Sequence, residues 1–427
     1  MSSVVIESAT PATAAPGIAP KEVRRTAWVL VAVAALAVLL AVLTPSGDSQ
    51  IRISTSADAL QIPVMTIPGR VGAVVLTILV AALAGYGFSL AQRSRAIPTW
   101  VVTTAGALAF VVLLLMLSAG KDQVVPVAGL LAGALFLATP LVFGALSGVL
   151  CERVGIVNIA IEGQLLAGAF AAAVVASMAG SSYAGLIAAP IAGVGVGALL
   201  AFFSIRYQVN QIIVGVVLNV LVVGLTSFLF STVLADNPNL NGRLGLPVLP
   251  IPLLSEIPVL GPVLFRQNVL VYLMYAIVIV LQVMIFRSRW GLRLRAVGEH
   301  PKAADTVGID VNRTRWRNTL LGGAVAGLGG AFFTVASGLA FGKDMTAGNG
   351  FIALAAMILG RWSPKGAVVA ALLFGLSKQL GLFIQQLQVP IPPQFLLMLP
   401  YVVTILAVAG FAGRVRAPAA EGVPYVK

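Results

Sequence analysis

The sequence predicts an all-α fold, a polytopic transmembrane bundle of about 10–12 spanning or half-spanning helices. Of its 427 residues, 59% are hydrophobic and only 10% are charged, and the mean hydropathy is +1.01. Apolar runs of about 20 residues recur along the chain, which is the length that a helix needs to cross the hydrocarbon of a bilayer. The sequence lacks the alternating ten-residue segments that are typical of membrane β-barrels. The spanning elements are therefore expected to be helices.

The apolar segments follow one another along most of the chain. They lie at residues 27–43, 70–91, 98–118, 125–150, 159–179, 183–204, 211–233, 268–286, 317–338, 350–360, 366–386 and 395–412. The run at 350–360 is too short for a full crossing, so we expect a re-entrant half-helix there. The run at 27–43 follows the basic sequence KEVRR, as in a signal peptide, but it is long and no convincing cleavage site follows. We interpret it as an uncleaved first span.

Basic residues indicate the orientation of the bundle. They cluster in alternate loops, at Lys21, Arg24, Arg25, Arg93, Arg95, Arg206, 287–317, Arg414 and Arg416. The positive-inside rule makes these loops, and both termini, cytoplasmic. The net charge of +13 is then a topology signal, and no nucleic-acid partner is expected. We divide the chain into a disordered cytoplasmic tail (1–26), N-terminal transmembrane helices (27–124), a core (125–413) with a cytoplasmic loop (287–317), and a cytoplasmic tail (414–427).

The sequence offers few residues for catalysis or metal binding. The only cysteine is Cys151 and the only histidine is His300, so no familiar metal-ligand spacing occurs. A membrane enzyme acting on lipids or glycans would want paired carboxylates, a histidine or a metal near an interface. We therefore predict no catalytic residues and no metal.

Several polar side chains interrupt the apolar segments and need partners there. In CERVGIVNIAIEG, Asn158 and Glu162 could line a solute path, whereas Glu152 and Arg153 are better interpreted as interfacial ionic groups. The alternative for Glu162 is that it caps or braces a helix. Asn219, eight residues after Gln211 and so roughly on the same helix face, could contact solute or hold two helices together.

Glycines mark two further features. Gly348 and Gly350 flank Asn349 just before the short apolar run, which predicts an unwound turn whose half-helix faces the path with its N-terminus. Phe351 and Trp362 could stack on a flat ring, although aromatic residues are more often interfacial anchors. Close helix packing is expected at Gly193, Gly197, Gly323 and Gly327.

The loop 287–317 is too ordered in its pattern to be a spacer. Pro301 suits the first position of a helix, Ala303 and Ala304 fit a short turn, and Gly308 suits its end, so we predict a helix at about 301–307. A short helix held parallel to the membrane could receive force from a soluble ATPase. A purely basic loop that attracts anionic lipid is the alternative.

Four segments, in order, resemble permease subunits of binding-protein-dependent importers for nucleosides, ribose-like sugars and branched-chain amino acids. They are CERVGIVNIAIEGQLLAGAF, VNQIIVGVVLNVLVVGLTSF, AVGEHPKAADTVGI and GKDMTAGNGFIALAAMILGRWSPKGA. The resemblance covers roughly residues 125–413 and is strongest to nucleoside-type permeases. It implies that Gly298, Glu299, Pro301, Ala303, Ala304 and Gly308 couple the subunit to its ATPase.

The resemblance also implies the partners and the location. These are a cytoplasmic ATP-binding-cassette ATPase, a second and non-identical permease subunit, an extracytoplasmic solute-binding lipoprotein and the bilayer of a bacterial plasma membrane. No cofactor is expected on this chain, because the ATPase uses the ATP, and no GxxxxGK[ST] motif occurs here. A sugar or amino-acid permease is the alternative, as is an ion-coupled secondary transporter in which Glu162 titrates.

Overall fold

The computed structural model describes residues 20–55, 58–121, 123–387, 398 and 416–426. Ten helices within this part of the chain are long and apolar enough to span a membrane, and an eleventh is shorter. The polytopic helical fold is thus confirmed. The predicted last span at 395–412 and most of the predicted tail at 1–26 lie outside the described residues.

The chain divides into two compact units, and the first comprises residues 1–50 and 66–123. It contains α1 (Pro20–Leu43), α2 (Gly69–Gln92) and α3 (Thr99–Ser118). Alanines and branched residues of the three helices form its core, including Ala37, Val80 and Val101. The short strands β1 (Asp48–Arg52), β2 (Met65–Pro68) and β3 (Val124–Pro126) lie where the chain passes from one unit to the other.

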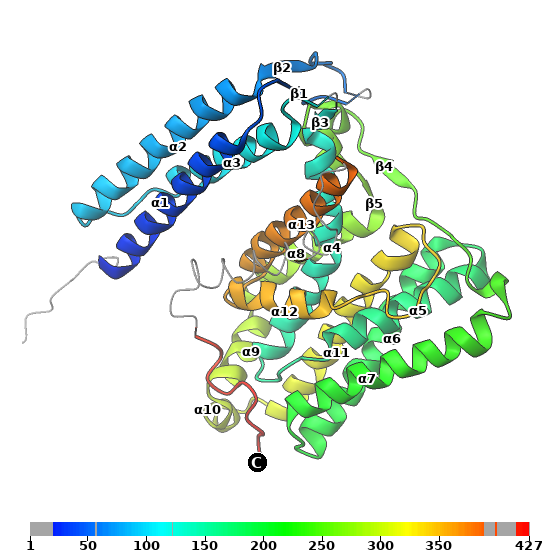
Figure 1. Cartoon of the computed structure of the whole chain (residues 1–427). Coiled ribbons are helices and arrows are strands. Elements are labelled where there is room, and N and C mark those ends of the chain that lie inside the picture. Colours follow the sequence, from blue (N-terminus) through cyan, green and yellow to red (C-terminus); the bar gives the residue numbers. More distant parts are fainter. Residues whose placement is uncertain (1–19, 56–57, 122, 388–397, 399–415, 427) are drawn as a thin grey trace, which may run out of the picture. The chain divides into compact units, whose positions relative to one another are not determined.

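The second unit comprises residues 51–65 and 124–427, and Figure 1 shows its helices. They are α4 (Val127–Glu152), α5 (Ile161–Ala179), α6 (Ser182–Ala201), α7 (Gln211–Leu229), α8 (Val269–Arg287), α9 (Arg289–Glu299), α10 (Pro301–Thr306), α11 (Val311–Gly330), α12 (Asn349–Leu359) and α13 (Pro364–Gln386). Strand β4 (Val248–Pro250) pairs antiparallel with β5 (Arg266–Asn268), with Val248 opposite Asn268.

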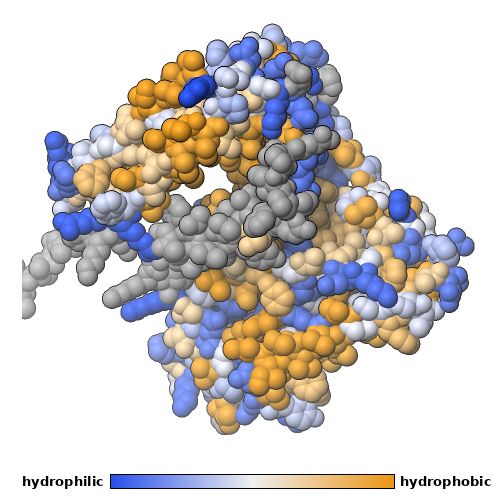
Figure 2. All heavy atoms as spheres, viewed as in Figure 1, coloured by the Kyte–Doolittle hydropathy of each residue, from blue (hydrophilic) through white to orange (hydrophobic). Residues whose placement is uncertain are grey.

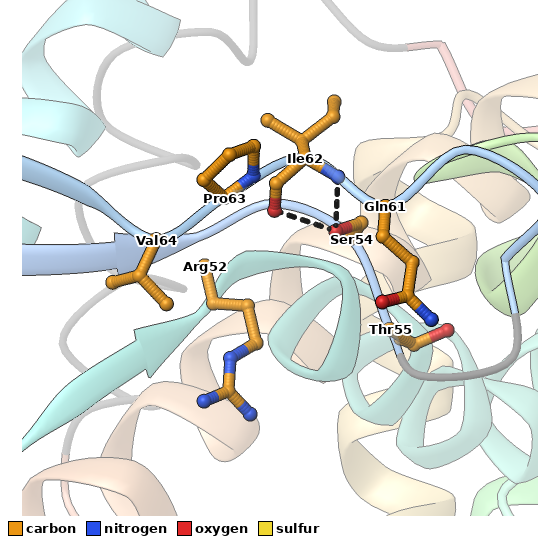
Figure 3. A pocket seen from close by; sticks show the side chains of 7 residues that line it. All are labelled: Arg52, Ser54, Thr55, Gln61, Ile62, Pro63 and Val64. Carbon is orange, nitrogen blue, oxygen red and sulfur yellow. Dashed lines mark hydrogen bonds between the residues drawn. The ribbon is translucent and has the colours of Figure 1, made fainter.

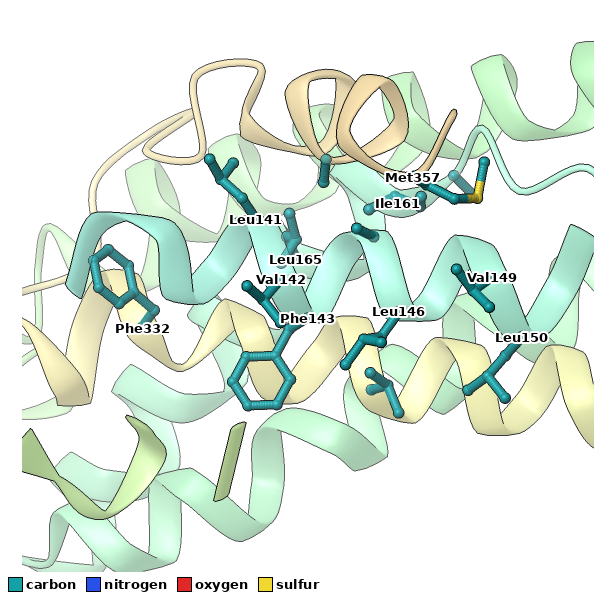
Figure 4. Packing of buried hydrophobic residues seen from close by; sticks show 14 of the residues in the cluster. Leu141, Val142, Phe143, Leu146, Val149, Leu150, Ile161, Leu165, Phe332 and Met357 are labelled. Carbon is teal, nitrogen blue, oxygen red and sulfur yellow. The ribbon is translucent and has the colours of Figure 1, made fainter. Parts of the chain in front are cut away.

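Helix α4 is the centre of this unit. It is buried along most of its length, and α5, α11, α12 and α13 pack around it. Leu141, Phe143 and Leu146 are fully buried, and Figure 4 shows them among side chains of neighbouring helices such as Met357 and Phe332. Because lipid surrounds a bundle of this kind, close packing and internal hydrogen bonds must hold these helices together.

Glycines set the spacing between α6 and α11. Gly193 and Gly197 of α6 lie directly against Gly323 and Gly327 of α11, and a methyl group at Gly193 would overlap the carbonyl oxygen of Gly323. Glycine removes the side chain that would hold two backbones apart. The α6–α11 contact is therefore a backbone-to-backbone contact at these positions.

Several helices end in a wider or tighter turn. Five-residue π-helical segments lie at η1 (Phe202–Arg206), η2 (Phe230–Leu234), η5 (Gly261–Phe265) and η6 (Phe332–Ala336), and short 3₁₀ segments at η3 (Pro238–Leu240) and η4 (Leu254–Glu256). Three of the π segments directly extend a spanning helix. They carry α6, α7 and α11 beyond the ends of their α-helical parts.

The described part of segment 51–64 folds back on itself (Figure 3). The Ser54 hydroxyl donates to the carbonyl of Ile62 at 2.9 Å and accepts from its N–H at 2.9 Å. A pocket of about 400 Å³ opens here, with Arg52 and Gln61 in its lining. The segment lies on the side of the bundle that the charge distribution predicts to be extracytoplasmic.

Two short helices confirm predictions from proline and glycine positions. The predicted helix at 301–307 is α10 (Pro301–Thr306), and the predicted half-helix at 350–360 is α12. The interpretation of 287–317 as a loop is wrong at both ends, because α9 occupies Arg289–Glu299 and α11 already begins at Val311. The buried positions of α9, Gly291, Leu294 and Gly298, recur every three to four residues and give that segment a helical apolar face.

Hydrophobic side chains also cover much of the surface (Figure 2). Ile187, Val220, Phe228 and Val369 are each more than 60% exposed. Exposed apolar side chains on this scale, on helices long enough to span a membrane, indicate surfaces that face hydrocarbon or another membrane subunit.

Candidate functional site

Helix α12 is a half-helix inside the second unit. It begins after Gly348, which has a left-handed φ of 78°, and it ends before Arg361 and Trp362, which also have positive φ. Its 11 residues extend only about 16 Å, roughly half the thickness of the hydrocarbon. Its ends therefore need polar partners supplied by the protein.

The carboxylate of Glu162 binds the N-terminus of α12. One of its oxygens accepts from the Thr346 hydroxyl at 2.6 Å and from the Gly348 N–H at 2.8 Å, and the other accepts from the Gly350 N–H at 2.5 Å. Glu162 is only 4% exposed. A negative charge at a helix N-terminus is favourable because the N–H groups there carry the positive end of the helix dipole.

Glu162 itself lies inside the bundle, because the α4–α5 loop folds back. Ile161 packs against Gly144 and Gly148 of α4, which are one to two turns before the end of that helix at Glu152. At 1.5 Å per residue, α5 begins roughly 6–12 Å inside the level at which α4 ends. The N-termini of α5 and α12 thus meet within the membrane-spanning region.

Lys378 of α13 adds a positive charge to this cluster, and the sequence reasoning missed it. Its ammonium group donates to the side-chain oxygen of Asn349, whose amide nitrogen donates to the carbonyl of Thr346 at 2.5 Å. Lys378 also lies near enough to Glu162 for electrostatic attraction. The isolated lysine within the apolar run 366–386 was the signal that could have found it.

The other end of α12 binds groups of opposite charge. The Arg153 guanidinium donates to the carbonyls of Trp362 at 2.8 Å and Arg361 at 3.4 Å, and the Trp362 indole donates to the Glu152 carboxylate at 2.6 Å. A cation near helix C-terminal carbonyls complements the dipole. Glu152 and Arg153 therefore both hold the segment that follows α12, and their partners here are uncharged groups of Arg361 and Trp362.

Helix α7 holds the irregular loop between α4 and α5. Asn219 accepts from the Gly163 N–H at 2.8 Å and donates to the carbonyl of Ile159 at 2.9 Å, and Gln211 accepts from the Val157 N–H at 2.6 Å. Each amide replaces a backbone hydrogen bond that a non-helical segment lacks. Asn219 therefore connects two helices in this structure, which was the alternative weighed for it.

Asn158 is fully buried in the same loop. It donates to the Ser147 hydroxyl and to the side-chain oxygen of Gln164, both at 3.0 Å. Of the five residues predicted to line a path, the structure brings Glu162 and Asn349 together at the α12 N-terminus. Phe351, in the first turn of α12, is 51% exposed, while Asn158 and Asn219 brace the neighbouring loop.

The predicted coupling residues lie around the junction of α9 and α10. Pro301 is the first residue of α10, Ala304 is buried, and Ala303 is exposed. Gly308 has a φ of +83° with open space around it, whereas a side chain at Gly298 would overlap the carbonyl oxygen of Arg153. The α9–α10 junction is thus packed directly on the loop that leads to Glu162.

The C-terminal segment 416–426 lies across this junction. Its backbone donates from Ala420 to the carbonyl of Gly298 at 2.9 Å and from Gly422 to the carbonyl of Gly155 at 3.2 Å. The Ala419 N–H donates to the Glu299 carboxylate at 3.3 Å. We call residues 416–426 the C-terminal strap, because it joins the end of α9 to the α4–α5 loop.

Arg315 of α11 connects the strap to the α4–α5 loop by hydrogen bonds. Its guanidinium donates to the carbonyls of Val154 at 3.2 Å and Val423 at 2.9 Å, and the residue is only 2% exposed. Neither the strap nor Arg315 was predicted. Nothing in the sequence separates Arg315 from its neighbours Arg313 and Arg317, which are exposed.

These spans, the buried half-helix and the polar contacts at both of its ends define a multi-pass membrane transport subunit. Among the described residues, no group of three or more His, Cys, Asp or Glu side chains could hold a metal ion. Residues 130–408 match the family of branched-chain amino acid transport system permease components. The chain belongs to this family, and it is the permease subunit of an ATP-binding-cassette (ABC) importer in the cell membrane.

Three relatives illustrate the similarity. The nucleoside ABC transporter permease protein NupC of Lactococcus lactis is 40% identical over 308 residues, covering 70% of this chain and 96% of the relative. The guanosine ABC transporter permease protein NupQ of Bacillus subtilis is 38% identical over 309 residues, covering 68% and 94%. A putative glucose ABC transporter permease protein, TsgC13 of Haloferax volcanii, is 34% identical over 270 residues, covering 62% and 80%. No solved structure matches the chain.

Membership of this family has consequences for partners and chemistry. An ABC importer permease works with an ATPase and a substrate-binding component, and it is a transport component rather than an enzyme. ATP hydrolysis therefore takes place on another subunit.

Proposed function

We propose that this permease imports a nucleoside, and that the solute passes the N-terminus of α12. The observation that carries the proposal is the cluster there: a carboxylate, an amide and an ammonium group from α5, α12 and α13 meet, and Phe351, in the first turn of α12, is 51% exposed. A nucleoside offers hydroxyls and ring nitrogens for hydrogen bonds and a flat base for stacking. The names of NupC and NupQ support the same solute class.

Two of the cluster's groups have room to exchange partners. Among the described residues Lys378 is partly exposed and Phe351 is exposed, whereas Asn349 and Glu162 are buried and Glu162 accepts from three donors. Lys378 can therefore turn toward a solute, which frees the Asn349 oxygen, while Glu162 keeps α12 in place. A nucleoside hydroxyl would accept from the ammonium group or donate to the Asn349 oxygen.

The coupling of this site to ATP hydrolysis is the second part of the proposal. We assign ATPase contact to Gly298, Glu299, Pro301, Ala303, Ala304 and Gly308, because the α9–α10 junction packs on the α4–α5 loop and the strap ties the two together. A force on α10 would reach the α4–α5 loop through these contacts and thus Glu162 and α12. Such a chain of packed elements can transmit a two-state change.

The partners that we propose are a cytoplasmic ABC ATPase, a second, non-identical permease subunit and an extracytoplasmic solute-binding lipoprotein. The exposed apolar side chains of α7, such as Val220, Leu225 and Phe228, offer a membrane-embedded face for either lipid or the second permease. No cofactor is assigned to this chain.

Uptake into vesicles tests this function. Vesicles that contain the chain with its candidate partners should accumulate labelled uridine only with ATP and an intact ATPase. Replacement of Gly308 with Arg should leave the complex assembled but stop uptake, because a side chain is strained at this φ and the residue lies at the coupling surface. Uptake that persists without the ATPase but collapses with an ionophore would instead establish an ion-coupled transporter.

A sugar is the second candidate solute, and the similarity to TsgC13 favours it. Ribose and glucose share the hydroxyl groups but lack the flat base. Phe351→Ala separates the two solutes: uptake of a nucleoside should fall, whereas uptake of a sugar that uses only the polar groups should change less.

A further inference from the structure

A basic pocket lies at the arginine-rich end of the second unit, and its lining shares no residue with the α12 cluster or with α10. It has a volume of about 570 Å³ and lies between the end of α6 with η1 and the first turns of α11. Its lining residues are Ile205, Arg206, Gln208, Asn312, Arg313, Trp316 and Arg317. None of them belongs to the α12 cluster or to the residues assigned to ATPase contact.

The pocket holds three positive charges without a compensating negative one. Arg206, Arg313 and Arg317 are exposed, no carboxylate lines the pocket, and within the described residues none of the three guanidinium groups has a hydrogen bond. The nearest acidic residue in the sequence, Asp310, accepts from the Arg313 backbone N–H at 2.9 Å and so caps α11. Three free guanidinium groups around one cavity suit a phosphate group, which accepts paired N–H donors.

The position of the pocket selects the source of that phosphate. It lies where two candidate membrane spans, Ser182–Arg206 and Val311–Ala336, have their arginine-rich ends. Phe202 and Phe203 of η1 and Tyr207 directly after it are exposed, and their rings contact one another with centroids 5.1–6.2 Å apart. Exposed aromatic clusters at the end of a span are typical of the bilayer interface, where phospholipid headgroups lie.

We propose that this pocket binds the phosphate group of an anionic phospholipid, with the headgroup between the three arginines. Trp316 and Ile205 supply apolar wall for the glycerol and the upper acyl chain, while Gln208 and Asn312 donate to headgroup oxygens. A lipid bound here connects α6 with the segment of α11 that directly follows α10. The transport activity itself does not depend on this assignment.

Lipid retention by the full-length protein tests the site. The chain is purified in mild detergent with equimolar phosphatidylglycerol and phosphatidylcholine of the same acyl length, and bound lipid is counted by native mass spectrometry. The test variant is Arg206→Gln/Arg313→Gln/Arg317→Gln. The matched control, Arg287→Gln/Arg289→Gln/Arg293→Gln, removes the same charge from exposed arginines that do not line the pocket.

Wild type and the control should retain phosphatidylglycerol in preference to phosphatidylcholine. Each arginine near an anionic headgroup contributes about fivefold to binding, so the pocket variant should bind phosphatidylglycerol on the order of one hundred-fold more weakly. Equal weakening in both triple variants, or none in the pocket variant, would overturn the proposal. Displacement of the lipid by millimolar inorganic phosphate would also overturn it. The same holds if the pocket variant retains lipid as wild type does but loses the ATPase from the purified complex.

Discussion

Replacing Glu162 with Gln should loosen the N-terminus of α12 while keeping the shape of the side chain. The carboxylate accepts three hydrogen bonds, two at one oxygen and one, from Gly350, at the other. Gln can keep the first two, but its NH₂ group then faces the Gly350 N–H, donor against donor. A buried N–H left without a partner costs about 1–3 kcal/mol, toward the upper end where the lost bond was charge-assisted, so we expect a local destabilisation of about 3 kcal/mol.

Hydrogen exchange followed by mass spectrometry measures this loss of local stability at the N-terminus of α12. A local loss of about 3 kcal/mol corresponds to roughly hundredfold faster exchange, and this should be confined to the peptide that contains Gly348 and Gly350. Gly350→Ala should act similarly, since its Cβ would lie 2.5 Å from the Glu162 backbone, and Gly342→Ala is the matched control because nothing lies within 4 Å of that position. Exchange within threefold of wild type in Glu162→Gln would refute this role for the carboxylate.

Three further predictions concern the packing of the bundle and the strap. Gly193→Ala should lower the unfolding temperature in detergent, because its methyl group would overlap Gly323 and overpacking costs about 1–3 kcal/mol. Gly195→Ala, in open space, should change the unfolding temperature little. Deleting residues 416–427 should leave a complex that assembles and hydrolyses ATP but imports less solute per ATP, and unchanged stoichiometry would contradict a coupling role for the strap. Burial raises the pKa of Glu421, whose carboxyl group faces that of Glu152, so strap attachment should be strongest at low pH and weaken as the pH rises through this raised pKa. Limited proteolysis of the strap should show this, and Glu421→Gln should reduce the pH dependence.

The sequence predicted the spans and the two short helices because each has a local physical cause. Apolar length defines the spans, Pro301 defines the start of α10, and Gly348 defines the turn before α12. Helix α9 was missed because four of its residues are charged, so it lacks the apolar length of a span. Its buried Gly291, Leu294 and Gly298 recur at helical spacing, and this periodicity would have predicted the helix.

The site was predictable only in part, because partners far apart in the sequence decide it. That Glu162 needs donors follows from its position in an apolar segment, but its partner Gly350 is 188 residues away, and no local pattern links the two. The same holds for Arg315, whose contact with Val423 spans 108 residues. Propensity and hydropathy describe neighbours along the chain, whereas these contacts arise from the packing of α5, α11, α12 and the strap.

Solute protection of a single cysteine at position 351 tests most directly whether the path passes the N-terminus of α12. The native Cys151 is fully buried, so a membrane-impermeant maleimide should label this chain only at Phe351→Cys in the assembled importer. Leu60→Cys, at a position that is 65% exposed in the segment 51–64 on the predicted extracytoplasmic side, is the control for general reactivity. We predict that uridine slows labelling at position 351 and leaves labelling at position 60 unchanged. Equal labelling of position 351 with and without uridine, in a complex that transports uridine, would place the path elsewhere and contradict this account.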